Sequence, residues 1–213
     1  VDFQATGIKR EERGRRTDEA IRLIKRLWTE QDVTFVGKYY SVENLTITPK
    51  PYKVGGPPIW IGGRSEAAWK RAGRLGDGWL VSSITASETG LGVNGINKYA
   101  AEAGRQVPED HFGVYLPFLF TDNPAIGLEQ AKPYLNSRSD VYDSEIAAIG
   151  TPETIRERIL EYMRSGATKF VMRPACSGNI WYKQLELLAK EVIEPLQTPF
   201  TAQERQKREG LTY

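Results

Sequence analysis

The sequence predicts an α/β protein in which helices cover a parallel sheet. Four short apolar runs, near residues 59, 79, 114 and 171, have the length of buried strands, and a segment with helical periodicity follows each of them. One more helical segment precedes the first run. Repeated strand-helix units are typical of a parallel sheet covered by helices. Because a closed (β/α)8 barrel holds eight such units, four units correspond to half of a barrel.

The overall composition is that of an ordinary globular protein. The 213 residues are 40% hydrophobic and 26% charged, and 29 basic against 27 acidic side chains give a net charge of +2. This balance argues against nucleic acid or a membrane surface as the main partner. No hydrophobic run approaches the roughly 18 residues of a membrane-spanning helix. The single cysteine, Cys176, excludes an internal disulfide and predicts a reducing, cytoplasmic location.

The first 16 residues are polar and charge-dense, which is typical of a solvated segment that leads into a helix. Because Val1 is not a methionine and no signal-peptide core follows it, we expect that residues precede it or were removed. Thr17 is the expected N-cap of the first long helix. The apolar face of that helix is predicted to consist of Ala20, Leu23, Ile24, Leu27 and Trp28.

An antiparallel hairpin is expected next, as an excursion from the main fold. Residues 33–36 and 39–42 are rich in β-branched and aromatic side chains and flank Gly37-Lys38 as the turn. Residues 45–48 extend the second half of the hairpin. The stretch 49–58 is too dense in proline and glycine for regular structure, and it separates the hairpin from the first buried strand.

The stretch 58–68 is the one around which the chain is organised. Ile59–Ile61 predicts a strand, Gly62-Gly63 a tight turn, and Ser65 the N-cap of a helix. Glycine lets the backbone approach a ligand closely, while the free N–H groups and the dipole of a helix N-terminus favour an anion. Arg64 adds a full positive charge. The turn therefore predicts a phosphate site, with an ordinary strand-to-helix loop as the alternative interpretation.

Strands and helices alternate after this turn. Ala68, Ala72 and Leu75 share a helix face that ends at Gly76, and residues 79–81 form the next strand. The segment 87–104 is interrupted by glycine and asparagine, so a helix is expected only around residues 96–103. The remaining predictions are a strand at 111–120 and a helix at 125–138 that breaks at Pro133.

The clearest helix signal begins at Thr151, an N-cap followed by proline, and ends at Gly166. Its apolar face is predicted to hold Ile155, Ile159, Tyr162 and Met163. Residues 169–172 predict the last strand. A final helix follows, with Trp181, Leu185, Leu188 and Val192 on one face, before a loose polar tail at 198–213.

Four segments together resemble the luciferase-like monooxygenase family, the flavin- and coenzyme F420-using (β/α)8 barrels related to bacterial luciferase. They are Phe3-Gln4-Ala5-Thr6-Gly7 with the charged run Glu11–Glu19, then Pro57–Gly63, Ala72–Trp79, and Ile149–Glu153. Their order and spacing are similar to the latter two-thirds of the family pattern. The resemblance spans about residues 1–195, and it is specific as a set although each segment alone is weak.

The resemblance implies that residues 1–197 form the C-terminal half, strands 5 to 8, of a TIM barrel with the hairpin inserted before strand 5. The family's first four strands have no counterpart before Val1. In the family the cofactor lies at the C-terminal ends of the strands, and the turn after strand 5 holds part of its phosphate. The expected cofactor-binding residues are therefore Gly62, Gly63, Arg64 and Ser65. Two candidate site-face residues, Ser82 and Arg173, follow later strands. Arg173 could reach a phosphate or a substrate carboxylate, and a surface salt bridge explains it equally well.

The function implied is a flavin-dependent oxidoreductase, with FMN-dependent monooxygenation of a small organic molecule first. Coenzyme F420-dependent hydride transfer is one alternative, and a truncated non-catalytic protein that binds flavin or a partner is the other. No nucleic acid or membrane partner is expected. An uncovered half-barrel predicts a homo-oligomer or association with the missing N-terminal half.

The other notable side chains favour structural interpretations. His111 is expected at the start of a strand, away from the site, and Cys176 has no histidine or lysine beside it to activate the thiol. Trp60 and Trp79 are expected in the core rather than stacked on a flavin. Ser82 and Ser83 follow the sixth strand, and turn formation explains both residues as well as a cofactor contact does. No metal-ligand spacing is present, and the catalytic residues cannot be assigned.

Overall fold

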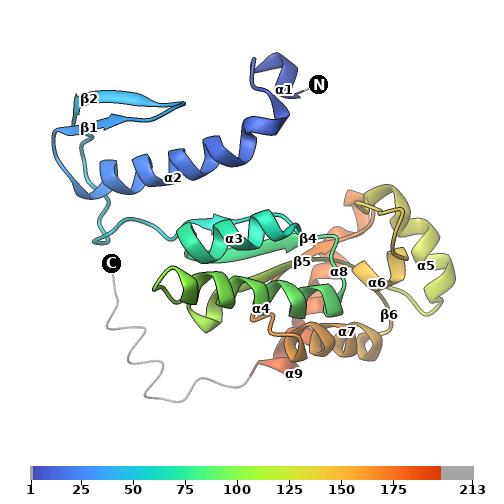
Figure 1. Cartoon of the computed structure of the whole chain (residues 1–213). Coiled ribbons are helices and arrows are strands. Elements are labelled where there is room, and N and C mark those ends of the chain that lie inside the picture. The colour runs from blue at the N-terminus through green and yellow to red at the C-terminus, as the bar shows by residue number, and fades with distance from the viewer. Residues whose placement is uncertain (1, 198–213) are drawn as a thin grey trace, which may run out of the picture. The chain divides into compact units, whose positions relative to one another are not determined.

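The computed structural model describes residues 2–197, which fall into two compact units (Figure 1). Unit 1 comprises Val1–Val114 and Ser165–Phe170, and unit 2 comprises Tyr115–Arg164 and Val171–Tyr213. The predicted tail at 198–213 lies outside the described residues. Within the described part, no helix is both long and apolar enough to cross a bilayer.

Unit 1 begins with helical segments: α1 (Asp2–Ala5), a 3-10 turn (Arg10–Glu12) and the long helix α2 (Arg13–Thr29). The predicted N-cap was wrong, because α2 starts four residues before Thr17. The Thr17 hydroxyl donates to the Arg13 carbonyl at 2.8 Å, one turn back inside the helix. Ile21 and Leu23 are buried, whereas Ile24, predicted on the apolar face, is 38% exposed.

The hairpin forms from β1 (Val33–Val36) and β2 (Ser41–Leu45), which are antiparallel with Val36 opposite Ser41. The second strand thus starts two residues later than predicted, and Tyr39 and Tyr40 lie in the loop. The carboxylate of Glu19 on α2 explains this shift, because it accepts the backbone N–H groups of residues 38, 39 and 40 at 2.8–3.0 Å. Those donors are therefore not available to a strand partner.

The strand-turn-helix unit at the predicted phosphate turn is confirmed. Strand β3 (Trp60–Ile61) is parallel to β4 (Gly78–Ser82), with Ile61 opposite Trp79. Helix α3 (Glu66–Leu75) follows β3, and its N-cap is Ser65, as predicted. The side chains of β4 alternate in burial. Trp79 and Val81 are buried, whereas Leu80 is 37% exposed on the opposite face.

Helix α4 (Ala86–Glu102) covers almost the whole segment for which only a short helix was predicted. It begins with a capping box between Thr85 and Glu88. Two of its glycines, Gly92 and Gly95, lie against tryptophan rings that occupy the space a side chain would need. A Cβ added at Gly92 would lie 2.4 Å from the Trp79 ring, and one at Gly95 would lie 3.0 Å from the Trp69 ring. The packing of tryptophans thus offsets the low helix propensity of glycine.

The sheet has the strand order β3-β4-β5-β6, with β7 also paired to β5, which makes an α/β fold with a parallel sheet. Strand β5 (Phe112–Phe120) follows a 3-10 turn at Glu109–His111 and confirms the predicted strand. Strand β6 (Ala148–Gly150) is parallel to β5 and was not predicted. Its three residues are too few to show strand periodicity. Strand β7 (Lys169–Pro174) confirms the last predicted strand.

The helices of unit 2 broadly follow the predictions. They are α5 (Pro124–Ala131) with a 3-10 turn (Lys132–Tyr134), α6 (Asp143–Ile146), α7 (Pro152–Arg164), a 3-10 turn (Gly178–Ile180), α8 (Trp181–Leu187), a π-helical segment (Leu188–Ile193) and α9 (Glu194–Leu196). Ile155, Ile159 and Tyr162 of α7 are buried as predicted, but Met163 is 46% exposed. Leu188 and Val192 are buried, whereas Trp181 and Leu185 lie largely exposed.

Candidate functional site

The turn between β3 and α3 has the backbone geometry of a ligand-approach loop. Gly63 adopts φ +107°, and a Cβ added there would lie 3.0 Å from the Cβ of Ala68. Glycine is therefore required at this position, whereas Gly62 has ordinary space around it. The Ser65 hydroxyl accepts the N–H of Ala68 at 3.4 Å and caps the helix. All four predicted residues, Gly62 to Ser65, are exposed, so the open N–H groups at the start of α3 are accessible to an anion.

Two hydrogen bonds connect this turn with the strand beside it and the loop that follows. The indole N–H of Trp79 donates to the Gly63 carbonyl at 2.9 Å. The second bond has its donor in the turn: Nη1 of Arg64 donates to the Ser83 carbonyl at 2.6 Å. Ser83 has φ +51°, a left-handed conformation that non-glycine residues seldom adopt. The β3–α3 turn is thus linked to β4 and to the β4–α4 loop.

A cavity of about 730 Å³ lies beside the turn within unit 1. Gly62, Gly63 and Ser65 line it, but the side chain of Arg64 does not. The opposite wall comes from the N-terminal segment, which was predicted to be a solvated approach. The full lining is Phe3, Glu11, Arg13, Gly14, Thr17, Trp60, Ile61, Gly62, Gly63, Ser65, Ala67, Ala68 and Arg71.

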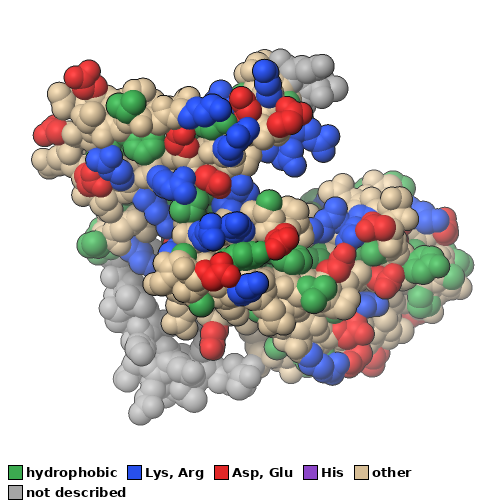
Figure 2. Space-filling view, in the orientation of Figure 1, with side chains coloured by type: hydrophobic (Ala, Val, Ile, Leu, Met, Phe, Trp, Pro, Cys, Tyr) green, Lys and Arg blue, Asp and Glu red, His purple; other side chains and the backbone are tan. Residues whose placement is uncertain are grey.

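Two arginines that the sequence did not single out line this cavity, together with one acid, Glu11. Arg13 is exposed at the start of α2, and Arg71 on α3 is 15% exposed in its side chain and paired with Asp18. The helices approach closely here, since a Cβ on Gly14 would lie 2.7 Å from Nη2 of Arg71. Figure 2 shows Lys and Arg side chains over α2 and α3. In the sequence, the glycine at position 14 inside an arginine-rich run was the one signal that another segment packs closely against this part of α2.

The two candidate site-face residues lie in different units. Ser82 is the exposed last residue of β4 in unit 1. Arg173 lies near the end of β7 in unit 2, half-buried, and its Nη1 donates to the Tyr134 carbonyl at 3.4 Å. Among the described residues, no hydrogen bond or ion pair joins Ser82 to the phosphate turn, so its cofactor role stays a prediction.

The structural interpretations of His111 and Cys176 agree with their surroundings. Nδ1 of His111 lies 2.5 Å from the Asp77 carbonyl, just before β5 begins, and its ring packs 5.1 Å from that of Trp60. Cys176 is 5% exposed in a cluster with Leu119 and Ala175. Burial raises the pKa of the Cys176 thiol, which disfavours the reactive thiolate.

The two tryptophans predicted to lie in the core have different surroundings. Trp79 is fully buried against α4, which confirms that it is a core residue. Trp60 is only half-buried and lines the cavity beside the turn. Its ring covers two glycines, because Cβ atoms on Gly78 and Gly113 would lie 2.7 and 3.1 Å from it. A ligand in this cavity would therefore meet two aromatic side chains, Trp60 from β3 and Phe3 from α1.

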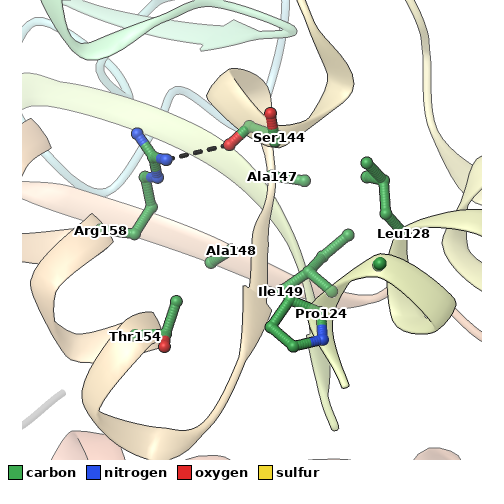
Figure 3. A pocket seen from close by; sticks show the side chains of 9 residues that line it. Pro124, Leu128, Ser144, Ala147, Ala148, Ile149, Thr154 and Arg158 are labelled. Atoms are coloured by element: carbon green, nitrogen blue, oxygen red, sulfur yellow. Dashed lines mark hydrogen bonds between the residues drawn. The ribbon is translucent and has the colours of Figure 1, made fainter. Parts of the chain in front are cut away.

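Unit 2 contains a second, smaller cavity of about 350 Å³ (Figure 3). It lies along β6 between α5 and α7, and its lining is mostly apolar. Arg158 is its one charged side chain, but the guanidinium already donates to the Ser144 carbonyl at 2.9 Å and to Glu161 at 2.6 Å. This cavity therefore offers a ligand little electrostatic attraction. Across residues 2–197, no group of three or more His, Cys, Asp or Glu side chains is arranged to hold a metal.

Comparison with known proteins points to one family. Residues 1–141 match the family described as luciferase-like monooxygenase. The chain is 30% identical over 185 residues to the FMNH(2)-dependent dimethylsulfone monooxygenase of Pseudomonas putida, which covers 85% of this chain and 46% of that protein. It is 33% identical over 125 residues to the F420-dependent glucose-6-phosphate dehydrogenase of Kineococcus radiotolerans, covering 57% of this chain and 36% of that protein.

A solved structure has a similar fold. The monooxygenase RslO1 from Streptomyces bottropensis superposes with a TM-score of 0.75 at 19% identity, over 92% of this chain and 65% of that chain. The chain therefore spans less than half the length of the two sequence relatives and about two-thirds of this structural one.

Proposed function

Because the chain belongs to the luciferase-like monooxygenase family, we propose that it is the part of a flavin-dependent oxidoreductase that holds the cofactor phosphate. FMN-dependent monooxygenation of a small organic molecule is the first candidate activity. Of the two sequence relatives described above, the one that matches more of this chain is FMNH(2)-dependent, which supports placing this activity first. The observation that carries the proposal is the exposed turn Gly62–Ser65, which opens onto a cavity of about 730 Å³.

The residues of the cavity fit a phosphate-bearing ring cofactor. A phosphate at the turn would meet the N–H groups at the start of α3 and the positive end of its dipole. Gly63 lacks the side chain that would obstruct a close approach, and Arg13 supplies charge from the opposite wall. Trp60 gives the cavity an apolar surface. Reduced FMN, when bound, supplies the electrons for oxygen activation, and the chain's own residues bind and orient it.

Titration of the complete protein with FMN tests this proposal directly. Quenching of flavin fluorescence measures the dissociation constant, and transfer of an oxygen atom from 18O2 to an organic substrate, beyond that seen with free reduced FMN, measures activity. We expect saturable FMN binding that inorganic phosphate weakens. An absence of binding to FMN and to coenzyme F420 alike contradicts the proposed function. Tight NADH binding would also contradict it, because the chain has no nicotinamide fingerprint of the G-x-G-x-x-G type.

Coenzyme F420-dependent hydride transfer is the second candidate, and one observation favours it. A cavity of about 200 Å³ shares Ala67 and Arg71 with the first. Its lining also holds the cations Arg22, Lys70 and Arg74 and one acid, Asp18, which pairs with Arg71, so positive charge predominates. A cofactor that carries carboxylates beyond its phosphate, as F420 does, would find complementary charge there. Spectral titration with both cofactors separates the candidates, because FMN has no group to place in this second cavity.

The family fold also suggests how the chain is completed. We propose that β3, β4, β5 and β7 correspond to strands 5 to 8 of a TIM barrel, with β6 as an addition. The partly exposed Leu80 and the exposed Ser82 of β4 would then face the barrel interior. A second copy or a companion half would cover this face. Light scattering on the 213-residue chain tests the proposal, and a stable 24.0 kDa monomer that exposes no dye-binding apolar surface would refute it. A non-catalytic flavin-binding protein would bind FMN but transfer no more oxygen to a substrate than free reduced FMN does.

A further inference from the structure

We propose that Trp79 is a positioning residue for the phosphate turn, acting through the carbonyl of Gly63, and that Arg64 supports the same turn through the carbonyl of Ser83. This inference rests on the proposed function, because it concerns the turn that would hold the phosphate. It assigns to Arg64 a role different from direct phosphate contact.

Trp79 cannot touch a ligand, since its side chain is 0% exposed. Its ring is fixed in the core by α4, where Gly92 leaves just enough room for it. From this fixed place its indole N–H donates to Gly63 at 2.9 Å, across 16 residues of sequence. A rigid core donor thus fixes one carbonyl of an exposed turn.

Gly63 needs such a restraint. Glycine has the largest conformational freedom of any residue, and a ligand that selects φ near +107° must otherwise meet the cost of ordering it. A turn already held in the binding conformation avoids that cost on binding. The bond from Trp79 therefore raises affinity for the group that the turn contacts, and for no other part of the ligand.

Arg64 makes the second bridge, in the opposite direction. It is exposed and does not line the cavity, and its Nη1 donates to Ser83 at 2.6 Å. Ser83 keeps φ +51° although it has a side chain, so its loop is held in an unfavourable conformation. Together the two bridges hold the β3–α3 turn against β4 and the loop after it.

The test compares FMN with riboflavin, which has the same ring but no phosphate, in the complete protein. Trp79→Phe removes the donor and keeps an aromatic ring in the core. We expect it to weaken FMN binding roughly fivefold, the value of one ordinary hydrogen bond, and to leave riboflavin binding unchanged. Trp69→Phe is the matched control, because the Trp69 indole nitrogen is buried without a hydrogen-bond partner among the described residues. It should change neither affinity.

Arg64→Ala provides a second route that does not disturb the core. We expect the same selective loss of FMN affinity, and we expect it to persist at high salt, because the lost bond joins a cation to a neutral carbonyl. A loss that disappears with salt would instead indicate direct charge contact with the phosphate and would overturn the role given to Arg64. If Trp79→Phe fails to fold, as judged by circular dichroism, the Arg64→Ala variant alone tests whether the turn must be held in place. A selective loss of FMN affinity that persists at high salt supports the inference, and no loss contradicts it.

Two further outcomes overturn the inference in distinguishable ways. Wild-type protein that prefers FMN over riboflavin, with unchanged preference in both variants, would refute the positioning role and leave the phosphate site intact. Wild-type protein that binds FMN no more tightly than riboflavin, and F420 no more tightly than its phosphate-free deazaflavin, would refute the phosphate site and the positioning role with it.

Discussion

The side-chain amide of Gln184 pairs with both backbone groups of Phe120 and so takes the place of a neighbouring strand at the end of β5. The Phe120 N–H donates to Oε1 of Gln184 at 2.7 Å, and Nε2 of Gln184 donates back to the Phe120 carbonyl at 3.4 Å. Gln184 is only 6% exposed on α8. A helix residue therefore satisfies strand groups that would otherwise be buried without partners.

Replacing Gln184 by Leu should strongly destabilise the protein. The variant keeps an apolar side chain of similar size but leaves the Phe120 N–H and carbonyl unpaired, which costs about 1–3 kcal/mol for each buried group. Urea unfolding followed by circular dichroism measures the free energy of unfolding. Gln130→Leu on the exposed surface of α5 is the control and should change it by less than about 0.5 kcal/mol. Equal effects of the two variants would contradict the role of Gln184.

Gly63→Ala should weaken both stability and FMN binding, whereas Gly62→Ala should leave stability unchanged. At Gly63 a side chain meets a positive φ and Ala68, a combination that costs about 1–3 kcal/mol. At Gly62 the nearest atom to an added Cβ, the Leu80 carbonyl oxygen, is 3.6 Å away, which is ordinary contact. Denaturant unfolding and FMN titration of both variants check this. If Gly62→Ala is as damaging as Gly63→Ala, backbone conformation is not what the turn requires.

Helix α4 offers a second matched pair of glycines. Gly92→Ala should destabilise the protein by roughly 1–3 kcal/mol, because the new methyl group collides with the Trp79 ring. Gly90→Ala should instead stabilise it by about 0.5–1 kcal/mol, since its nearest neighbour is 3.7 Å away and alanine favours helix. Thermal unfolding of the two variants gives opposite shifts of Tm. Shifts of the same sign would show that Trp79 does not lie against Gly92.

Asp77 should make stability fall in acid. Burial raises the pKa of Asp77, but hydrogen bonds from the Ile59 N–H and from Lys25, with the charge of Arg105, outweigh it and hold the pKa below its usual range. The folded carboxylate thus binds protons less readily than the unfolded one. The contribution of Asp77 to the free energy of unfolding is complete above the pKa of about 4 that it has in the unfolded chain. This contribution is lost as the pH falls through the lower pKa of the folded state.

Asp77→Asn should therefore be less stable than the wild type at pH 7, and the difference should shrink below pH 4. Unfolding free energies measured from pH 7 to pH 3 provide the comparison. Asp122 is exposed and makes no ion pair among the described residues, so Asp122→Asn is the control, and its free energy of unfolding should follow that of the wild type across this pH range. A difference for Asp77→Asn that stays constant across this range would mean that its charge does not stabilise the fold.

The sequence by itself determined the elements that depend on neighbours within one or two turns. The strand at residue 60, the Ser65 cap, the proline-initiated helix α7 and the long strand β5 all carry their signals in adjacent residues. The turn Gly62–Ser65 was found in the same way, because two glycines between a strand and a capped helix are visible without any knowledge of distant partners.

Only the tertiary structure decided which distant groups meet at these elements. The bonds from Trp79 to Gly63 and from Arg64 to Ser83 span 16 and 19 residues, and the pairing of Phe120 with Gln184 spans 64. Tryptophan rings pack against Gly92 and Gly95 of α4, and the contact between α2 and α3 brought Arg13 and Arg71 to the cavity. Local propensity is worth less than about 1 kcal/mol per residue, so packing and buried hydrogen bonds of similar or larger size override it, and their partners are set by the fold as a whole.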